Sequence, residues 1–287
     1  MALRSYLHST FDPRRIPGLQ AWYDAADSSS VTLDAGRVSQ WSDKSGNARH
    51  ATNTTSGSTQ PSYSTAARNG LNVLRFAAAS VQRLTVAGTG TFNFLHNGTD
   101  SWIAAVSVYG TSSNPLANYA LFGNNGQSSA NIGLVFYYDD RNIPGTYVAS
   151  DALLCQVTTT PGNTNPIRLL SLTSDAPIAA YSNIVTPQTM LVQEAVIDAD
   201  NATPSQRFRL RLNGGVEIAE NPNPSISNGT PTTSNATFAL QIGANGNNVS
   251  TLEGDICELM FFNQLPTAAA RDLIRRYLGA KWGVTVG

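Results

Sequence analysis

Asn-Gly dipeptides recur along this chain and constrain its fold more than any other feature of the sequence. They begin at Asn69, Asn97, Asn125, Asn213, Asn228 and Asn245. Asparagine and glycine tolerate the positive φ angles that two-residue hairpin turns require. Each pair therefore predicts a tight turn between two strands, and their recurrence predicts a chain built mainly of antiparallel strands.

Short runs rich in β-branched and aromatic residues lie between these turns. In the clearest case Phe208, Leu210 and Leu212 alternate with three arginines, and a period of two is typical of a half-buried strand in an antiparallel sheet. We predict strands at Leu71–Phe76, Val81–Val86, Trp102–Tyr109, Ile132–Tyr138, Ala152–Thr158, Met190–Ile197, Arg207–Leu212 and Phe238–Ile242. The pattern indicates an all-β protein, a sandwich of two antiparallel sheets.

A helical pattern is predicted only near the carboxyl-terminal end. Pro266 and Thr267 precede Ala268–Trp282, where residues such as Ile274 and Tyr277 fall on one face of a 3.6-residue period. Proline is tolerated near the first turn of a helix because no intrahelical partner exists there for an N–H group. We expect this short helix to pack its apolar stripe on the sandwich.

The first fifteen residues are predicted to be an arm, and residues 16–287 a single β-sandwich domain. The arm contains little core pattern but carries Arg4, Phe11, Arg14 and Arg15. We expect these side chains to dock the arm on acidic and apolar patches of a neighbouring subunit.

The charge composition excludes several classes of function. Charged residues make up 13% of the chain, with 18 Lys+Arg and 19 Asp+Glu giving a net charge of −1. Nucleic-acid binding is not expected, since it needs a row of basic residues to displace counterions. No apolar run approaches the roughly 18 residues that cross a bilayer, and the amino-terminal segment has no apolar signal core. Cys155 and Cys257 are expected to be buried free thiols.

Three segments together resemble the laminin-G-like, concanavalin A-like lectin/glucanase superfamily. The first is Ile16–Asp27 with Val38–Thr52, which matches the family pattern W-x-D-x-S-G-N-x-x-H-A-T. The second is Phe208–Ala219, similar to a family hairpin. The third is Leu252–Asn263, similar to the closing strand that runs into the helix. The resemblance implies a jelly-roll sandwich with a short carboxyl-terminal helix, over roughly residues 16–285.

Members of this family with a short arm and no export signal are often virion proteins of bacteriophages. The resemblance therefore implies a non-enzymatic structural component, a capsid decoration or cement protein or a tail-associated protein. Such a protein is made in the host cytoplasm, contacts other virion proteins and forms homo-oligomers. The alternative, which is compatible with the first, is a carbohydrate-binding adhesin that attaches to host surface glycans. A glycoside hydrolase is the third hypothesis.

The hydrolase hypothesis depends on Glu253, Asp255 and Glu258. Laminarinase-type hydrolases of the same superfamily carry E-x-D-x-x-E on a strand, and a retaining mechanism needs two carboxyl groups about 5–5.5 Å apart. Here Gly254 stands where a large apolar residue is usual, and a non-catalytic closing strand accounts for the same residues. We therefore expect no catalytic residues.

A calcium site is predicted at the loop that holds Asp43, Ser45 and Asn47, with Glu258 among the candidates for a further carboxylate. Ca²⁺ takes about 6–8 oxygen ligands, and a tight polar loop offers several. The alternative is that Asp43 and Asn47 accept hydrogen bonds from the backbone of their own turn.

A glycan-binding surface is predicted at Asn125, Tyr137, Tyr138 and Asp139. These residues combine ring faces with amide and carboxylate groups at predicted strand ends, and loops at the rim of a sandwich commonly carry binding functions. A solvated turn explains Asp139 equally well.

Overall fold

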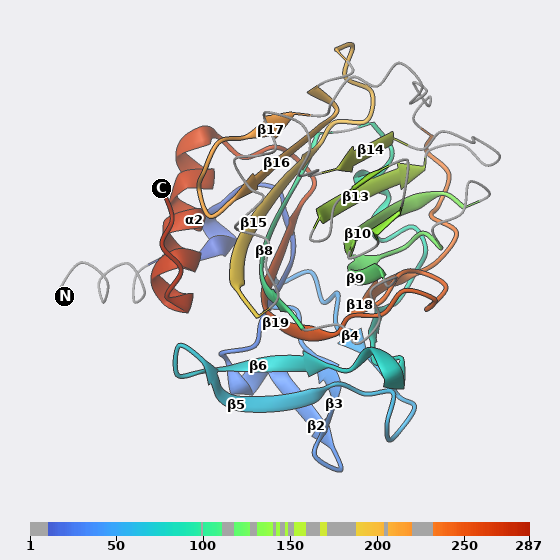
Figure 1. Ribbon diagram of the computed structural model, residues 1–287, viewed down its shortest axis with the longest axis vertical. Helices are drawn as coiled ribbons and strands as arrows, with labels where there is room; N and C mark the ends of the chain where they lie inside the picture. Colours follow the sequence, from blue (N-terminus) through green and yellow to red (C-terminus); the bar gives the residue numbers. More distant parts are fainter. Residues whose placement is uncertain are drawn as a thin grey trace.

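The computed structural model describes residues 11–98, 100–110, 118–126, 131–139, 142–143, 147–148, 152–158, 167–170, 188–203, 206–219 and 232–287. Within these ranges the protein is all-β, with antiparallel strand pairs and one α-helix near the carboxyl-terminal end (Figure 1). The predicted fold class is therefore confirmed. No helix in the described ranges is both long and apolar enough to cross a membrane.

The first eight strands are β1 Leu19–Asp24, β2 Val31–Asp34, β3 Arg37–Trp41, β4 Ala51–Thr52, β5 Ser62–Arg68, β6 Leu71–Phe76, β7 Leu84–Val86 and β8 Ser101–Tyr109. The next six are β9 Asn118–Gly123, β10 Gly133–Asp139, β11 Asn142–Ile143, β12 Tyr147–Val148, β13 Ala152–Thr158 and β14 Ile167–Leu170. The last strands are β15 Met190–Ile197, β16 Phe208–Leu212, β17 Ile218–Ala219, β18 Leu240–Ile242 and β19 Gly254–Phe262. The helices are η1 Pro13–Arg15, η2 Ser28–Ser30, η3 Ala78–Ser80, η4 Asn93–Leu95 and α2 Ala268–Trp282.

Strand β19 organises one layer of the sandwich. One of its edges pairs with β8, and its other edge pairs with β6 at the start and with β1 at the end. Strand β8 continues the layer to β15, which pairs with β16 and then β17. Because β6 and β1 share one edge, the first residues of β19 lie beside different neighbours from its last residues.

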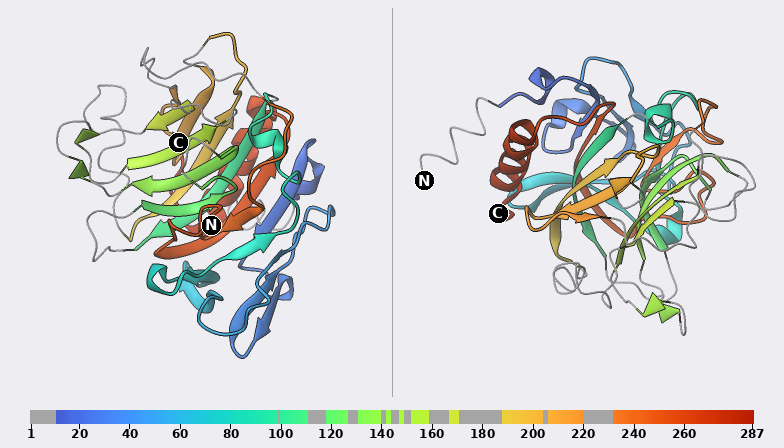
Figure 2. Two further views of the ribbon diagram at one scale, coloured as in Figure 1. Left: turned by 90° about the vertical axis from the view of Figure 1, so that its right-hand side faces the viewer. Right: turned by 90° about the horizontal axis from the view of Figure 1, so that it is seen from above.

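The opposite layer consists of β4, β7, β18, β9, β10, β13 and β14 in pairing order. Strand β3 pairs with β2, β4 and β5 and so connects the two layers (Figure 2). Aromatic rings from the two layers meet between them, as where Phe122 of β9 packs edge-on against Phe261 of β19 at 5.0 Å. The main hydrophobic core therefore lies between the layers.

Helix α2 covers the outer face of the β19 layer. Ile274, Leu278 and Trp282 are buried there in a second apolar cluster with Met260 of β19 and Trp22 of β1. The helix begins after Thr267, whose hydroxyl accepts a hydrogen bond from the Ala270 N–H, and ends at Gly283 with a φ of 73°. The predicted helix bounds and its packing on the sandwich are confirmed.

Two Asn-Gly pairs form the predicted hairpin turns. Asn69 and Gly70 connect β5 to β6 with φ angles of 47° and 74°, and Asn213 and Gly214 connect β16 to β17 with 47° and 72°. The pair at Asn97 follows the short helix η4 instead, and the pair at Asn228 lies outside the described residues. The dipeptide therefore marks turns of more than one kind.

The strand predicted at Val81–Val86 is shorter than expected. Val81 has a φ of 51°, and only Leu84–Val86 pairs with a neighbouring strand. The cause is the buried side chain of Gln82, whose amide oxygen accepts a hydrogen bond from the Ala77 N–H at 2.8 Å and whose amide nitrogen donates to the Ser58 carbonyl at 3.1 Å. These contacts hold the segment out of the sheet.

Candidate functional site

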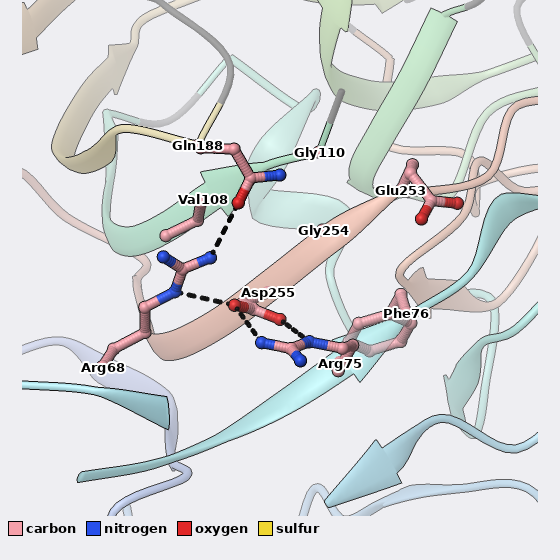
Figure 3. A pocket seen from close by; sticks show the side chains of 9 residues that line it. All are labelled: Arg68, Arg75, Phe76, Val108, Gly110, Gln188, Glu253, Gly254 and Asp255. Atoms are coloured by element: carbon pink, nitrogen blue, oxygen red, sulfur yellow. Dashed lines mark hydrogen bonds and ion pairs between the residues drawn. The ribbon is translucent and has the colours of Figure 1, made fainter. Parts of the chain in front are cut away.

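A polar pocket of about 250 Å³ lies at the start of β19 (Figure 3). Its walls come from segments that are far apart in sequence: the ends of β5 and β6, the end of β8, a residue shortly before β15 and the start of β19. The lining residues are Arg68, Arg75, Phe76, Val108, Gly110, Gln188, Glu253, Gly254 and Asp255. The antiparallel pairing of β19 with β6 and β8 brings these residues together.

Asp255 lies at the centre of the pocket wall and is buried, with 1% of its side chain exposed. Arg75 donates to it from Nε at 2.7 Å and from Nη2 at 3.1 Å, and Arg68 donates from Nε at 2.8 Å. The hydrogen bond with Asp255 raises the pKa of Arg75. Arg68 also donates from Nη2 to the amide oxygen of Gln188 at 3.3 Å, which links the ion pairs to the β15 side of the pocket.

Glu253 supplies the second carboxylate of the pocket. Its Oε2 accepts a hydrogen bond from the Ala78 N–H at 2.9 Å, and its backbone carbonyl accepts from the Gly110 N–H at 2.7 Å. Two guanidinium groups and two carboxylates therefore line the pocket, so the charges in its wall balance. Hydrogen-bond donors remain on the arginines and Gln188, and an acceptor remains at Glu253 Oε1.

Gly254 shapes the backbone between the two acidic residues. It has a φ of 147°, and a Cβ atom there would collide with the carbonyl oxygen of Val108. The close approach of β8 explains why glycine stands at this position, where a hydrolase motif usually has a large apolar residue.

Glu258 lies three residues after Asp255 on β19. It is fully buried, and its contacts differ from those of Asp255. Its Oε1 accepts hydrogen bonds from Trp22 Nε1 at 2.8 Å and from the Tyr277 hydroxyl at 3.0 Å. Its Oε2 accepts from Lys281 Nζ and from Trp282 Nε1, each at 2.8 Å. Burial raises the pKa of Glu258, and the charge of Lys281 opposes this rise. The carboxylate ties β1, β19 and α2 together.

The carboxylates proposed for hydrolysis are thus held by separate partners. The pairing of β19 with β8 is irregular between Ile256 and Glu258, and Asp255 and Glu258 engage different cations on either side of that irregularity. A retaining hydrolase needs one carboxyl group as nucleophile and another as acid facing the same sugar. Four donors occupy Glu258 within the protein, so the arrangement indicates structural roles for it.

The predicted calcium loop is organised by its own hydrogen bonds. Asp43 accepts from the backbone N–H groups of Trp22, Ser45 and Arg49 at 2.8–3.0 Å, and from the Ser45 hydroxyl at 2.8 Å. Asn47 donates from Nδ2 to the carbonyl of Leu19 at 3.1 Å. No three His, Cys, Asp or Glu side chains of the described chain gather as a metal site would require. Calcium binding by Asp43, Ser45, Asn47 and Glu258 stays a prediction.

Three of the four residues predicted for glycan binding lie inside the protein. Tyr137 and Tyr138 are 3% and 1% exposed, and Asn125 is fully buried. The ring of Tyr138 stacks on that of Tyr109 with centroids 4.4 Å apart, in the core between the layers. Tyr137 projects from the other face of β10 and is buried in a small cluster with Ala120 and Val135. The Asp139 side chain lies outside the described residues.

The residues predicted for docking divide into two groups. Phe11 is partly buried against α2, and Arg14 forms an ion pair with Asp12 at 2.8 Å. Phe11 therefore contacts Tyr277 of its own chain, and docking of these residues on a neighbouring subunit stays a prediction. Arg15 is exposed, and Arg4 lies outside the described residues.

Of the two cysteines, Cys257 is a buried free thiol, as expected. Burial raises the pKa of this thiol well above its ordinary value. The side chain of Cys155 lies outside the described residues.

The polar pocket was not predicted. Arg68, Arg75 and Gln188 form no motif in the sequence, and 187 and 180 residues separate Arg68 and Arg75 from Asp255. The one available signal was Arg75, the single charged residue in the run Leu71–Phe76.

The sequence matches no protein-family model and no curated protein sequence. Solved structures resemble the chain in fold. Domain 4 of AbnA, a GH43 extracellular arabinanase from Geobacillus stearothermophilus, in complex with arabinotriose, has a TM-score of 0.51 and 13% identity, covering 90% of this chain and 99% of that domain. The Ruminococcus gnavus IT-sialidase CBM40, bound to alpha2,3 sialyllactose, has a TM-score of 0.40 and 12% identity, covering 61% and 80%.

The similarity to the arabinanase domain extends over most of both chains, so this protein shares a β-sandwich architecture with it. The described residues therefore form a β-sandwich with a polar pocket at the start of its closing strand. The architecture is consistent with the concanavalin-like fold that the sequence resemblance implies.

Proposed function

We propose that the chain is a non-catalytic glycan-binding module, and that the pocket at the start of β19 holds a neutral sugar residue. The observation that carries this proposal is the balanced set of polar groups in the pocket wall: Arg68 and Arg75 against Glu253 and Asp255. A fold shared with an arabinanase domain that was solved with arabinotriose supports the glycan class.

Sugar hydroxyl groups both donate and accept hydrogen bonds, so they match a wall that offers both. Arg75 is 49% exposed and Arg68 is 23% exposed, so their remaining N–H groups can reach a ligand from solvent. Glu253 Oε1 offers an acceptor on the opposite side. A charged ligand would leave one sign of charge in excess, which favours a neutral sugar.

Binding without hydrolysis is proposed because the carboxylates of β19 are engaged by other side chains. Asp255 is held by Arg68 and Arg75, and Glu258 is enclosed by donors from β1 and α2. Neither carboxylate is left unpaired to attack a sugar. The proposed role is therefore attachment, the adhesin alternative of the sequence analysis.

The proposal is tested by isothermal titration of the purified protein with arabinotriose and with a panel of neutral and acidic oligosaccharides. We expect saturable binding of a neutral member. Arg75→Gln should weaken that binding by about tenfold, the loss of one hydrogen bond to a charged group. Arg14→Gln is the matched control, because Arg14 is also a surface arginine paired with an aspartate.

Two results would contradict the proposal. One is a lack of binding across all neutral members of the panel. The other is equal binding by the wild type and Arg75→Gln while both proteins keep the same melting temperature.

The virion role rests on the sequence resemblance alone, and we keep it as a proposal for where the module acts. A glycan-binding module on the surface of a phage particle would serve attachment to the host. Purified particles should then contain the protein, which mass spectrometry of the particles would detect. Its absence from washed particles would refute this location and leave the glycan proposal standing.

A further inference from the structure

Three arginines and one glutamate meet where β16 lies beside helix α2 (Figure 1). Arg209 and Arg211 project from β16, Arg271 comes from the second turn of α2, and Glu217 lies between β16 and β17. We call this set the Glu217 cluster. It shares no residue with the pocket at the start of β19.

The contacts within the Glu217 cluster are long. Arg209 and Arg211 approach the carboxylate oxygens at 3.6 Å, and Arg271 approaches at 3.4 Å. Charge-assisted hydrogen bonds of this kind usually measure about 2.7–2.9 Å. The Nε atom of each of the three arginines is buried and has no hydrogen-bond partner. The cluster is therefore short of acceptors.

Counting donors, acceptors and charges also shows that the cluster is short of acceptors. Each guanidinium carries five N–H donors, and a carboxylate offers about four lone-pair sites. In the described part of the chain, Glu217 is the sole carboxylate that forms an ion pair with any of the three arginines. Three positive charges thus face one negative charge in a protein whose net charge is −1.

The carboxylate that lies opposite the cluster in the strand pairing is already engaged. Glu194 lies opposite Arg211 in the strand pairing of β15 with β16, but both of its oxygens accept from Arg275 of α2. Arg275 also contacts Asp272 at 3.1 Å. Arg275 therefore pairs with Glu194 and Asp272, and the Glu217 cluster still has three arginines for one carboxylate.

We propose that the Glu217 cluster binds an oxyanion, a sulfate or carboxylate group of the kind that acidic glycans carry. Planar guanidinium groups bind such oxyanions through paired hydrogen bonds, which makes arginine the usual residue for this task. The three side chains are 16–27% exposed, so an anion can approach their terminal nitrogens from solvent. The bound anion would supply close acceptors to these terminal nitrogens, which Glu217 reaches only at 3.4–3.6 Å.

The test titrates the full chain with sodium sulfate while sodium chloride holds the ionic strength constant. Arg271→Gln should weaken sulfate binding by about tenfold, as expected for one lost charged hydrogen bond. Glu217→Gln should tighten it by about fivefold, because a neighbouring negative charge no longer repels the ligand. Arg276→Gln is the matched control: it lies on the same helix, is 62% exposed and pairs with Asp272 outside the cluster.

A sulfated oligosaccharide and its desulfated counterpart distinguish the sources of the anion. Tighter binding of the sulfated form than of free sulfate identifies a glycan as the source, and equal affinity identifies the free anion. The proposal is overturned if sulfate does not bind to the wild type, or if Arg271→Gln and Glu217→Gln leave the affinity unchanged while melting as the wild type does. Loss of neutral-sugar binding in Arg75→Gln is a separate result, because that residue belongs to the pocket.

Discussion

Two arginine sites on this protein differ in how completely carboxylates neutralise them. In the pocket, Asp255 contacts Arg68 and Arg75 at 2.7–3.1 Å, and Glu253 balances the remaining charge. In the Glu217 cluster, three arginines share one carboxylate at 3.4–3.6 Å. The same residue types therefore give one site with balanced charge and one with an excess of positive charge.

Burial of the carboxylate explains the difference. Asp255 is 1% exposed, and an unpaired charge at that depth would cost several kcal/mol in lost hydration. Glu217 is 25% exposed, so water completes its hydration and long contacts are tolerated. Glu258 is the extreme case, since it is fully buried and accepts four hydrogen bonds. The comparison predicts that removing a partner costs most where the carboxylate is deepest.

The largest effect is expected for Lys281→Met. Lys281 is 2% exposed and donates to both Glu258 and Asp24, so its loss leaves Glu258 without a cation in the interior. We expect a loss of about 3–5 kcal/mol in the free energy of unfolding, measured by urea denaturation. The double variant Lys281→Met with Glu258→Gln should recover part of that loss. A Lys281→Met protein as stable as the wild type would show that burial of the carboxylate does not set the cost of losing its partner.

An intermediate effect on stability is expected for Asp255→Asn in the pocket. A much smaller effect is expected for Glu217→Gln in the Glu217 cluster. Asp255→Asn should lower the free energy of unfolding by about 2 kcal/mol, less than full burial implies because Arg75 is half exposed. Glu217→Gln should change it by less than about 0.5 kcal/mol. Equal costs for the two variants, in parallel urea denaturations, would show that burial does not separate the sites.

The smallest effect concerns a buried group with incomplete partners. His96 is fully buried; its Nε2 donates to the Ser234 carbonyl at 2.9 Å, and its Nδ1 has no partner. Burial lowers the pKa of His96. Because its pKa is lower in the folded than in the unfolded state, the stabilisation is present above about pH 6.5 and declines as the pH falls through the folded-state pKa.

The melting temperature of the wild type should therefore fall between pH 7 and pH 5 more steeply than that of His96→Gln. Parallel pH profiles for the two proteins would show that His96 does not contribute.

Much of the fold was predictable because its signals are local. The alternation of Phe208, Leu210 and Leu212 with arginines predicted β16, and the strand pairs with neighbours on both edges. The apolar face of residues 268–282 predicted α2 to the residue. Asp43 was singled out as a residue that organises its loop. The sequence left open whether a metal ion or backbone N–H groups bind its carboxylate.

The candidate sites were predicted less well because their geometry depends on contacts between distant segments. Tyr137 and Tyr138 were expected at a rim, since the sequence of one strand does not show what packs against each of its two faces. Asp255 and Glu258 share a strand and a residue class, and the sequence suggested one function for both. Their partners on β5, β6 and α2 give them different environments.

The all-β architecture and the closing helix could be read from the amino-acid sequence, because backbone preference and hydrophobic period act over a few neighbouring residues. Which charges meet depends instead on how distant segments pack. The free energy of an ion pair depends on burial and on atomic distance, and both are fixed when strands 180 residues apart come together in one sheet. The balanced pocket and the Glu217 cluster are results of that assembly.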